Sequence, residues 1–223
     1  MRTQAVEDYL KAIYDLGRTG APVTTSAMAG RLGVAPATVT GMIKKLATLN
    51  LVDHESYRGV ALTEAGRRIA LEVIRHHRLV ERYLHEAMGV PWDQVHVEAE
   101  KWEHVLSEEM EDRMDEILGS PTTDPHGSPI PSRDLKLEEP DQMLLSLLRE
   151  GQTATVAEVG DEDPAMLRYF AELGLFPTAS VEVVRVAPFE GPMTLKVSGA
   201  ECSIGRPAAE HVFVKNVEGG NGQ

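Results

Sequence analysis

Two histidines and two carboxylates share one face of a segment that reads as helix. They stand at spacings i, i+4, i+7 and i+8 within HVEAEKWEHVLSEEME, residues 96–111, and are His96, Glu100, Glu103 and His104. At about 100° per residue, these side chains fall within roughly a quarter-turn of one another, beside an apolar stripe. Carboxylates held there would repel one another unless a cation lay between them. The pattern favours a divalent-metal site, and the alternative is a set of ordinary surface pairs.

A second group of metal-ligating side chains occurs in the preceding helical segment. His77 and Glu81 stand one turn apart there, and His96 could join them from a facing helix. In the first helical segment, Asp8 is flanked by apolar residues on its C-terminal side. Asp8 could complete one site with the following residues of the other segment: Glu100, Glu103 and His104. Two metal sites are therefore expected, one of them near the base of the N-terminal module.

Periodicity and capping signals define the elements that would carry these side chains. Helices are expected at residues 4–17, about 25–32, about 36–51 and from 64 to about 88, with N-caps at Thr24 or Thr25 and at Thr63. Apolar residues of the third helix are expected to face the core: Val39, Ile43, Leu46 and Leu49. A β-hairpin with Gly59 near its polar tip is expected at residues 51–63. Residues 90–118 are expected to form another long helix, broken near its start, in which Met110 and Met114 fill core gaps.

The composition changes after residue 118. Residues 119–141 are rich in Pro, Gly and Ser, which is typical of a linker or an extended arm, and they contain His126, a weaker candidate ligand. His76 and His85 are expected to be solvated. Beyond the linker, short runs rich in β-branched residues surround one expected helix at residues 165–176 and predict a small β-barrel. The chain is thus expected to be mainly α-helical with a small β domain, divided into residues 1–68, 69–140 and 141–223.

Composition and charge limit the functional class. The 223 residues carry a net charge of −13, yet residues 1–68 hold 9 basic and 6 acidic side chains. The remaining residues hold 13 basic and 29 acidic side chains. Only the first third of the chain therefore has a charge suited to binding nucleic-acid phosphates, while the acidic remainder is suited to binding cations. A single cysteine, Cys202, and the lack of a long apolar run favour a cytoplasmic protein without a signal peptide or membrane span.

The order helix, turn, helix and hairpin in residues 1–68 is that of a winged helix-turn-helix. The second helix of this motif can lie in the major groove of DNA, where threonine hydroxyls reach bases or phosphates and an alanine can touch a thymine methyl group. Lysines, the wing arginine and the start of the preceding helix would contact the DNA backbone. The expected DNA-binding residues are Thr25, Ser26, Ala37, Thr38, Thr40, Lys44, Lys45 and Arg58. The alternative is a helical bundle with a solvated polar face.

A catalytic role has little support in the sequence. Glu100, Glu103 and His104 stand one residue short of the H-x-x-E-H signature of zinc peptidases, because Glu100 replaces its first histidine. The sequence also has no H-E-x-x-H motif, no nucleophile motif and no phosphate-binding loop. We therefore expect a protein that is not an enzyme and has no catalytic residues.

Together these features resemble the diphtheria-toxin-repressor family of metal-dependent transcription regulators. The resemblance covers nearly the whole chain and is carried by EDYLKAIYDL, ATVTGMIKKL, HHRLVERYL, HVEAEKWEHVLSEEME and PHGSPIP. It implies a winged helix-turn-helix, a helical metal-binding and dimerisation domain, and a C-terminal SH3-like barrel of the FeoA type. It implies a primary metal site of Asp8, Glu100, Glu103 and His104. It also implies an ancillary site of His77, Glu81, His96, Glu158 and Asp161, the last two by alignment on GLFP (174–177).

Departures from the family pattern bear on the choice of metal. The resemblance implies a methionine in place of Asp8 and a cysteine in place of Glu100 in iron-responsive members, and oxygen ligands in manganese-responsive ones. Carboxylates suit Mn²⁺, whereas sulfur suits later metals. Lys11 stands where some short manganese sensors carry a glutamate, which argues for well-separated sites rather than a closely spaced metal pair. Ala37 and Gly41 also differ from iron-responsive members, so the operator sequence does not follow from the resemblance.

The sequence therefore predicts a cytoplasmic, homodimeric repressor of metal-uptake genes that binds double-stranded operator DNA. Mn²⁺ is the expected activator, and Fe²⁺ is a further candidate because oxygen and nitrogen ligands bind both ions. Metal would tether Asp8 to the second long helix and fix the spacing of the two reading helices in the dimer. Two alternatives stay open at this point. One is a metal-dependent hydrolase with a DNA-binding domain, and the other is a regulator that senses an organic ligand.

Overall fold

The computed structural model describes residues 3–18, 22–55, 59–138 and 140–219. The chain forms two compact units, each assembled from segments that are distant in the sequence. Unit 1 comprises Met1–His77, Trp102–Glu108 and Pro131–Leu137, and unit 2 comprises Arg78–Lys101, Glu109–Ile130 and Glu138–Gln223. The long helix α4 (Glu64–Met88) contributes residues to both units. Within the described ranges, no helix has both the length and the apolar character that a membrane crossing requires.

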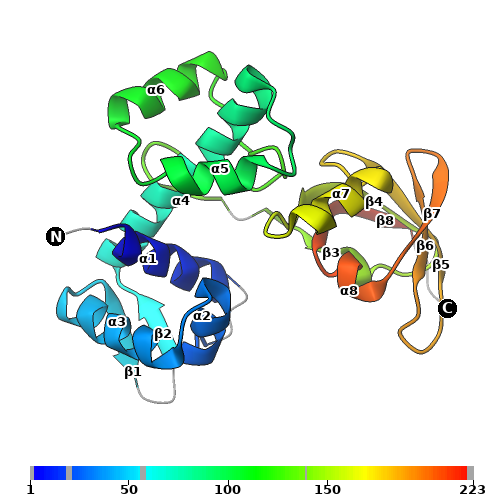
Figure 1. Cartoon of the computed structure of the whole chain (residues 1–223). Coiled ribbons are helices and arrows are strands. Elements are labelled where there is room, and N and C mark those ends of the chain that lie inside the picture. Colours follow the sequence, from blue (N-terminus) through cyan, green and yellow to red (C-terminus); the bar gives the residue numbers. More distant parts are fainter. Residues whose placement is uncertain (1–2, 19–21, 56–58, 139, 220–223) are drawn as a thin grey trace. The chain divides into compact units, whose positions relative to one another are not determined.

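Unit 1 contains a helix-turn-helix followed by a two-stranded antiparallel wing (Figure 1). Helices α1 (Gln4–Gly17), α2 (Thr25–Leu32) and α3 (Pro36–Thr48) precede strands β1 (Val52–Glu55) and β2 (Gly59–Leu62). The strands pair from Val52 opposite Leu62 to Glu55 opposite Gly59. One apolar core joins all these elements to the first half of α4, and its members include Leu10, Met28, Val39, Leu46, Val52, Val60 and Ala70. The predicted winged helix-turn-helix is confirmed.

Side-chain caps and a left-handed glycine set the helix boundaries in unit 1. Thr24 Oγ1 accepts a hydrogen bond from the backbone N–H of Ala27 at 3.1 Å, so α2 begins directly after Thr24. Gly33 follows the last residue of α2 with φ of 63°, a conformation that glycine adopts without steric penalty. Thr63 Oγ1 accepts from the N–H of Gly66 at 3.1 Å and starts α4, as predicted.

Three predicted burial states are wrong. Leu49 is 42% exposed, because α3 ends one residue before it. Met110 is 46% exposed on helix α6 (Glu108–Ile117), because the buried face of α6 carries Met114 instead, which fills the core as predicted. His76 is buried rather than solvated, and its Nδ1 forms a hydrogen bond of 3.1 Å with the backbone carbonyl of Glu103.

The predicted long helix at residues 90–118 is wrong, because the structure forms two helices there. Helix α5 spans Val95–Trp102, and α6 begins at Glu108. Between them, the N–H groups of Val105 and Leu106 both donate to the carbonyl of Trp102, at 3.0 and 3.1 Å, which closes a turn. Within this turn, Glu103 is buried and accepts hydrogen bonds from Lys11 of α1. Hydrogen bonds from Lys11 thus hold the Glu103 side chain in this turn, where the chain is not helical.

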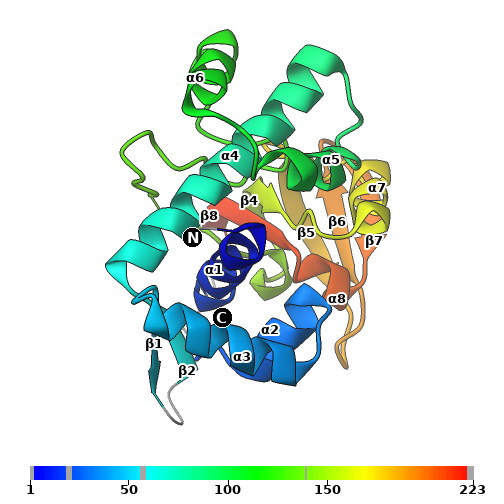
Figure 2. The same ribbon diagram turned by 60° about the vertical axis from the view of Figure 1, so that its left-hand side comes forward.

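Unit 2 is built around a six-stranded antiparallel sheet in the order β3-β8-β4-β5-β6-β7. Figure 2 labels β4, β5, β6, β7 and β8 of this sheet. The strands are β3 (Met143–Leu144), β4 (Gln152–Val159), β5 (Ser180–Val186), β6 (Met193–Val197), β7 (Ala200–Ile204) and β8 (Val212–Gly219). A 3-10 helix (Leu145–Leu147), α7 (Pro164–Glu172) and α8 (Arg206–Ala209) share one apolar core with the strands. Its members include Leu145, Phe170, Leu195, Ala209 and Val214. The predicted small β domain is confirmed.

Residues 119–141 were expected to be a linker or an extended arm, and their first half is not a solvated linker but a packed loop. Asp124, His126 and Ser128 are buried there. Gly127 has φ of 93°, and a Cβ at this position would lie 2.1 Å from the carbonyl oxygen of Ala157 in β4. Only a glycine permits this approach, so the segment PHGS lies directly against the strand.

Two glycines of unit 1 provide a matched test of this packing. A Cβ added to Gly66, in the first turn of α4, would lie 2.0 Å from the carbonyl oxygen of Leu51, whereas one added to Gly30, within α2, would meet no atom within 4 Å. We expect Gly66→Ala to lower the free energy of unfolding by about 1–3 kcal/mol, because the backbone must shift. Gly30→Ala should raise it by about 0.5–1 kcal/mol through helix propensity. Urea denaturation at equal protein concentration measures both, and equal stability of the two variants would contradict the close approach at Gly66.

Candidate metal centres

The first group of metal-ligating side chains lies in unit 1 and is named here the Asp8 cluster: Asp8, Glu103 and His104. Each offers one ligand atom, and these atoms lie within 4.8 Å of one another. His104 Nε2 is 2.8 Å from Asp8 Oδ1 and 3.3 Å from Glu103 Oε1. The Glu103 side chain is fully buried, while that of Asp8 is 34% exposed, so the cluster is reached from the side of α1. Two carboxylates and an imidazole form an oxygen-and-nitrogen ligand set for a divalent ion.

Lys11, on the same helix as Asp8, places a buried positive charge beside this cluster. Its Nζ donates to both carboxylate oxygens of Glu103, at 2.8 and 3.1 Å, and lies 3.1 Å from His77 Nδ1. His77 Nδ1 also bonds the Glu103 carboxylate directly. Burial alone would raise the pKa of Glu103, but His77 and Lys11 outweigh burial and hold this pKa below its usual value. Glu103 is therefore an ionised carboxylate. The positive charge of the Lys11 ammonium group would repel a second metal ion bound beside Glu103.

Glu100, the fourth residue expected at the primary site, belongs to unit 2. Its side chain is 47% exposed, and its carboxylate lies 3.8 Å from His96 Nε2. The structure thus brings three of the four predicted residues together within unit 1. The place of Glu100 in that site stays a prediction.

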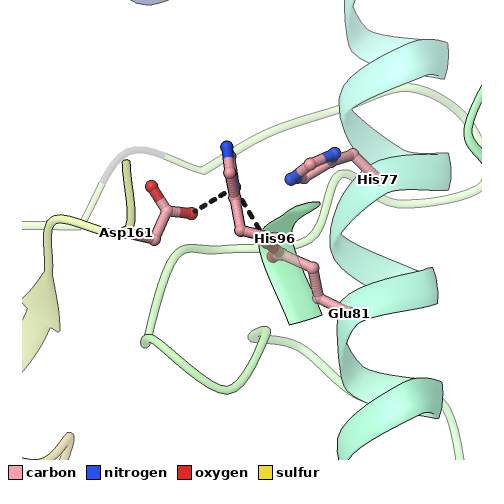
Figure 3. A group of neighbouring side chains, drawn as sticks. All are labelled: His77, Glu81, His96 and Asp161. Atoms are coloured by element: carbon pink, nitrogen blue, oxygen red, sulfur yellow. Dashed lines mark hydrogen bonds and ion pairs between the residues drawn. The ribbon is translucent and has the colours of Figure 1, made fainter. Parts of the chain in front are cut away.

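The second group lies in unit 2 and is named the Glu81 cluster: Glu81, Asp124, His126 and Asp161. Glu81 is on α4, Asp124 and His126 are in the packed loop, and Asp161 follows β4. Their ligand atoms also lie within 4.8 Å of one another. His96, on α5, borders this cluster between Glu81 and Asp161 (Figure 3), with Nδ1 at 3.1 Å from Glu81 and 3.5 Å from Asp161.

The packed loop directs two ligand atoms into the Glu81 cluster. Asp124 Oδ1 accepts hydrogen bonds from the backbone N–H groups of His126, at 2.8 Å, and Ser128, at 3.0 Å. His126 Nε2 bonds the backbone carbonyl of Trp92 at 2.8 Å, so in the neutral ring Nε2 carries the proton and Nδ1 keeps its lone pair. The remaining atoms, Asp124 Oδ2 and His126 Nδ1, are buried and make no hydrogen bond to any described residue. Buried polar atoms without a hydrogen bond are uncommon in folded proteins, and a bound cation or water can account for them.

Burial and neighbouring carboxylates together shift the pKa values around the Glu81 cluster. Burial first, and then the charge of Glu81, raise the pKa of Asp124 above its usual value, against the opposing charges of His126 and Arg78. Burial lowers the pKa of His96, but hydrogen bonds and charges from Asp161 and Glu81 outweigh it and raise the pKa to about 10. The same field that holds a proton on His96 would attract a metal ion.

Two residues expected at the ancillary site also have partners outside the Glu81 cluster. Glu158 is buried and accepts hydrogen bonds from Ser128 Oγ at 3.0 Å and from Gln142 Nε2 at 2.8 Å. It thereby fixes the packed loop at Ser128. His77 stands one turn before Glu81 on α4 (Figure 3), and its contacts with Glu103 and Lys11 lie in unit 1.

The sequence pattern underestimates the packed loop. It does not identify Asp124, and it makes His126 only a weaker candidate ligand within a linker. The available signal was a histidine and an aspartate within the Pro- and Gly-rich segment DPHGSP, where a flexible linker has no use for metal-ligating side chains.

The predicted DNA-binding residues form an exposed polar face on α3. Ala37, Thr38, Thr40, Lys44 and Lys45 are all exposed there. The Thr40 hydroxyl donates to the backbone carbonyl of Pro36 at 3.0 Å, so it is held against its own helix. At the start of α2, Ser26 is exposed and Thr25 is half-buried, and Arg58 lies outside the described residues.

Family models cover almost all of the chain in three consecutive segments. Residues 1–60 match the iron dependent repressor, N-terminal DNA binding domain, and residues 63–132 match the iron dependent repressor, metal binding and dimerisation domain. Residues 143–216 match the FeoA domain. The order of these matches agrees with the observed order of winged helix-turn-helix, helices and β domain.

Individual relatives agree with these matches. The iron-dependent repressor IdeR of Mycobacterium bovis is 42% identical over 125 residues, which span 56% of this chain and 54%, about half, of that protein. The diphtheria toxin repressor of Corynebacterium efficiens is 30% identical over 225 residues, covering 96% of both chains. A solved structure of a manganese-dependent transcriptional repressor in complex with manganese is 40% identical, with a TM-score of 0.88, and covers 94% of this chain and 98% of that one. The chain therefore belongs to the diphtheria-toxin-repressor family of metal-dependent transcriptional repressors.

Proposed function

We propose that this chain is a homodimeric repressor of metal-uptake genes that binds operator DNA when activated by Mn²⁺, with Fe²⁺ as a second activating ion. The observation that carries the proposal is the Asp8 cluster, which draws its ligand atoms from α1 of the winged helix-turn-helix and from the turn after α5. The relatives support it, because they are named as iron-dependent or manganese-dependent repressors. They do not favour a hydrolase or a sensor of organic ligands.

The residues of the Asp8 cluster would couple metal binding to the position of the reading helix. A bound divalent ion supplies the positive charge that neighbouring carboxylates need in order to approach one another. Asp8 would then be held to Glu103 and His104, with Glu100 as a fourth ligand. Because α1 shares one apolar core with α2 and α3, fixing α1 also fixes α3. In a dimer the two α3 helices would keep a spacing of about one DNA turn, and metal and DNA affinities would rise together.

The proposed preference for Mn²⁺ follows from the ligand chemistry. Both clusters offer carboxylate oxygens and imidazole nitrogens, and Cys202, the only cysteine in the sequence, lies in β7 and belongs to neither cluster. Hard oxygen ligands suit Mn²⁺, while soft sulfur ligands favour later metals. Fe²⁺ binds the same atom types, so its availability would decide how far it replaces Mn²⁺.

The Glu81 cluster would hold a second ion. Asp124 and His126 are proposed as ligands because each presents a buried atom with no hydrogen bond to the described residues, and Glu81 and Asp161 complete the group. His96 borders the cluster through Glu81 and Asp161, whereas Glu158 is proposed to position the loop through Ser128 rather than to bind metal. Asp161 would make the β domain part of the metal centre. The proposed role of His77 at this site rests on its place one turn before Glu81 on α4 and on the family resemblance.

Operator binding measured by fluorescence anisotropy tests the activation mechanism. The probe is a fragment of the chain's own promoter or of a neighbouring transporter promoter, at fixed salt, with Mn²⁺, Fe²⁺, Zn²⁺ or chelator. We expect metal to raise the affinity by about 5–150-fold, with Mn²⁺ effective at the lowest concentration. Asp8→Ala should abolish this gain while leaving thermal unfolding unchanged. Asp15→Asn alters a carboxylate of the same helix outside the cluster and should keep the metal-dependent gain in operator affinity. An undiminished gain in Asp8→Ala would refute the mechanism.

The positive charge of Lys44 on α3, the proposed DNA-reading helix, predicts that operator affinity depends on salt concentration. Lys44→Ala should weaken metal-activated operator binding and reduce the slope of log affinity against log salt by about 0.9, because one phosphate contact is lost. Lys196→Ala, which removes an exposed lysine from β6 of the β domain, is the matched control and should leave the slope as it is. The same anisotropy titration at several salt concentrations measures both, and equal slopes for the two variants would remove Lys44 from the DNA contact.

The assignment of the second ion is tested by calorimetric titration with MnCl₂. The unaltered chain should bind two ions, and Asp124→Asn should bind one, because a buried ligand oxygen becomes an amide. Glu158→Gln should still bind two, since this residue is proposed to hold Ser128. Loss of the second ion in Glu158→Gln, with both ions retained in Asp124→Asn, would reverse the two assignments.

A further inference from the structure

The two ring nitrogens of His104 face different surroundings, all within unit 1. Nδ1 lies 2.6 Å from Glu7 Oε2, a hydrogen-bond distance. Nε2 lies beside Asp8 and Glu103 but forms no hydrogen bond with any described residue. The His104 side chain is only 7% exposed, so water has little access to the ring. One side of the imidazole is thus held by a carboxylate, while the other side is directed into the Asp8 cluster.

We propose that Glu7 is a positioning residue of the metal centre, which holds His104 in the tautomer and orientation that binds metal. This inference rests on the proposed function of the Asp8 cluster. A neutral imidazole has one N–H and one lone pair, and the partner of one nitrogen decides which tautomer is present. Because a carboxylate can only accept, a neutral ring that donates its one N–H from Nδ1 to Glu7 keeps its lone pair on Nε2, the atom that lies 2.8 Å from Asp8 Oδ1 and 3.3 Å from Glu103 Oε1.

The position of Glu7 on α1 makes this role distinct from that of a ligand. Glu7 and Asp8 are consecutive in the first turns of α1, and they reach opposite nitrogens of the same ring, at 2.6 and 2.8 Å. Glu7 is also buried, with its side chain 11% exposed, so its charge acts on His104 with little screening by water. An anionic acceptor on Nδ1 raises the basicity of Nε2 and hence its strength as a ligand.

The test is a calorimetric titration of the full chain with MnCl₂, in which the contribution of the Asp8 cluster is identified by its loss in Asp8→Ala. Removing a partner that orients a metal-binding histidine typically weakens metal affinity by about 10–100-fold, and we expect this loss for Glu7→Ala. Glu7→Gln keeps an oxygen acceptor without the charge and should recover part of the affinity. Asp15→Asn should bind as the unaltered chain does. Equal affinity in Glu7→Ala and the unaltered chain would overturn the proposal.

A second measurement separates positioning from a general effect on folding. Long-range ¹H–¹⁵N correlation spectra of the metal-free, histidine-labelled chain report which nitrogen of His104 is protonated. We expect Nδ1 to carry a proton in the unaltered chain and to lose part of this protonation in Glu7→Ala, with thermal unfolding little changed. An unaltered tautomer in Glu7→Ala would overturn the role of Glu7 even if metal affinity falls. Failure of the unaltered chain to bind Mn²⁺ would instead count against the proposed function, and the spectra would still decide the role of Glu7.

Discussion

Three buried carboxylates, those of Glu81, Glu103 and Asp124, impose the electrostatic constraint on which this structure depends. The side chains of Glu81 and Glu103 are fully buried, and Asp124 is 1% exposed. Burying an ionised carboxylate costs several kcal/mol unless donors or positive charges surround it. The chain supplies part of this compensation itself, through Lys11 at Glu103 and His96 at Glu81. A metal ion in each cluster, as proposed, would supply the rest.

This constraint accounts for the two irregular features of the fold. The segment after Trp102 leaves the helix where Glu103 is bonded to Lys11, and the packed loop is held where Asp124 accepts the N–H groups of His126 and Ser128. A regular helix would not bring Glu103 to Lys11, and a solvated linker would not place Asp124 inside the protein. Buried polar groups need such partners. The departures from regular structure therefore coincide with the ligand atoms of the two clusters.

The two clusters also differ in what they join. The Asp8 cluster connects the first helix of the winged helix-turn-helix with a turn of the helical region, so it suits a switch that acts on DNA binding. The Glu81 cluster connects a long helix and a loop with Asp161, which follows a strand of the β domain. It would suit a structural role, in which the β domain would contribute a proposed ligand. Glu7 would orient the His104 imidazole from one side and Asp8 would bind metal on the other side. Because both residues are on α1, the switch would depend on the orientation of α1.

The sequence by itself determined the helix-turn-helix, the wing, the small β domain and most of the ligand candidates. These depend on local signals: apolar periodicity, the caps at Thr24 and Thr63, and the i, i+4 spacing of polar residues on a helix. Only the tertiary structure decided that the helix breaks after Trp102, that His126 is buried beside Asp161, and that Glu7 reaches His104. Those features arise from contacts between residues up to 97 positions apart, and their free energy comes from burial and pairing of charge, which no local pattern encodes.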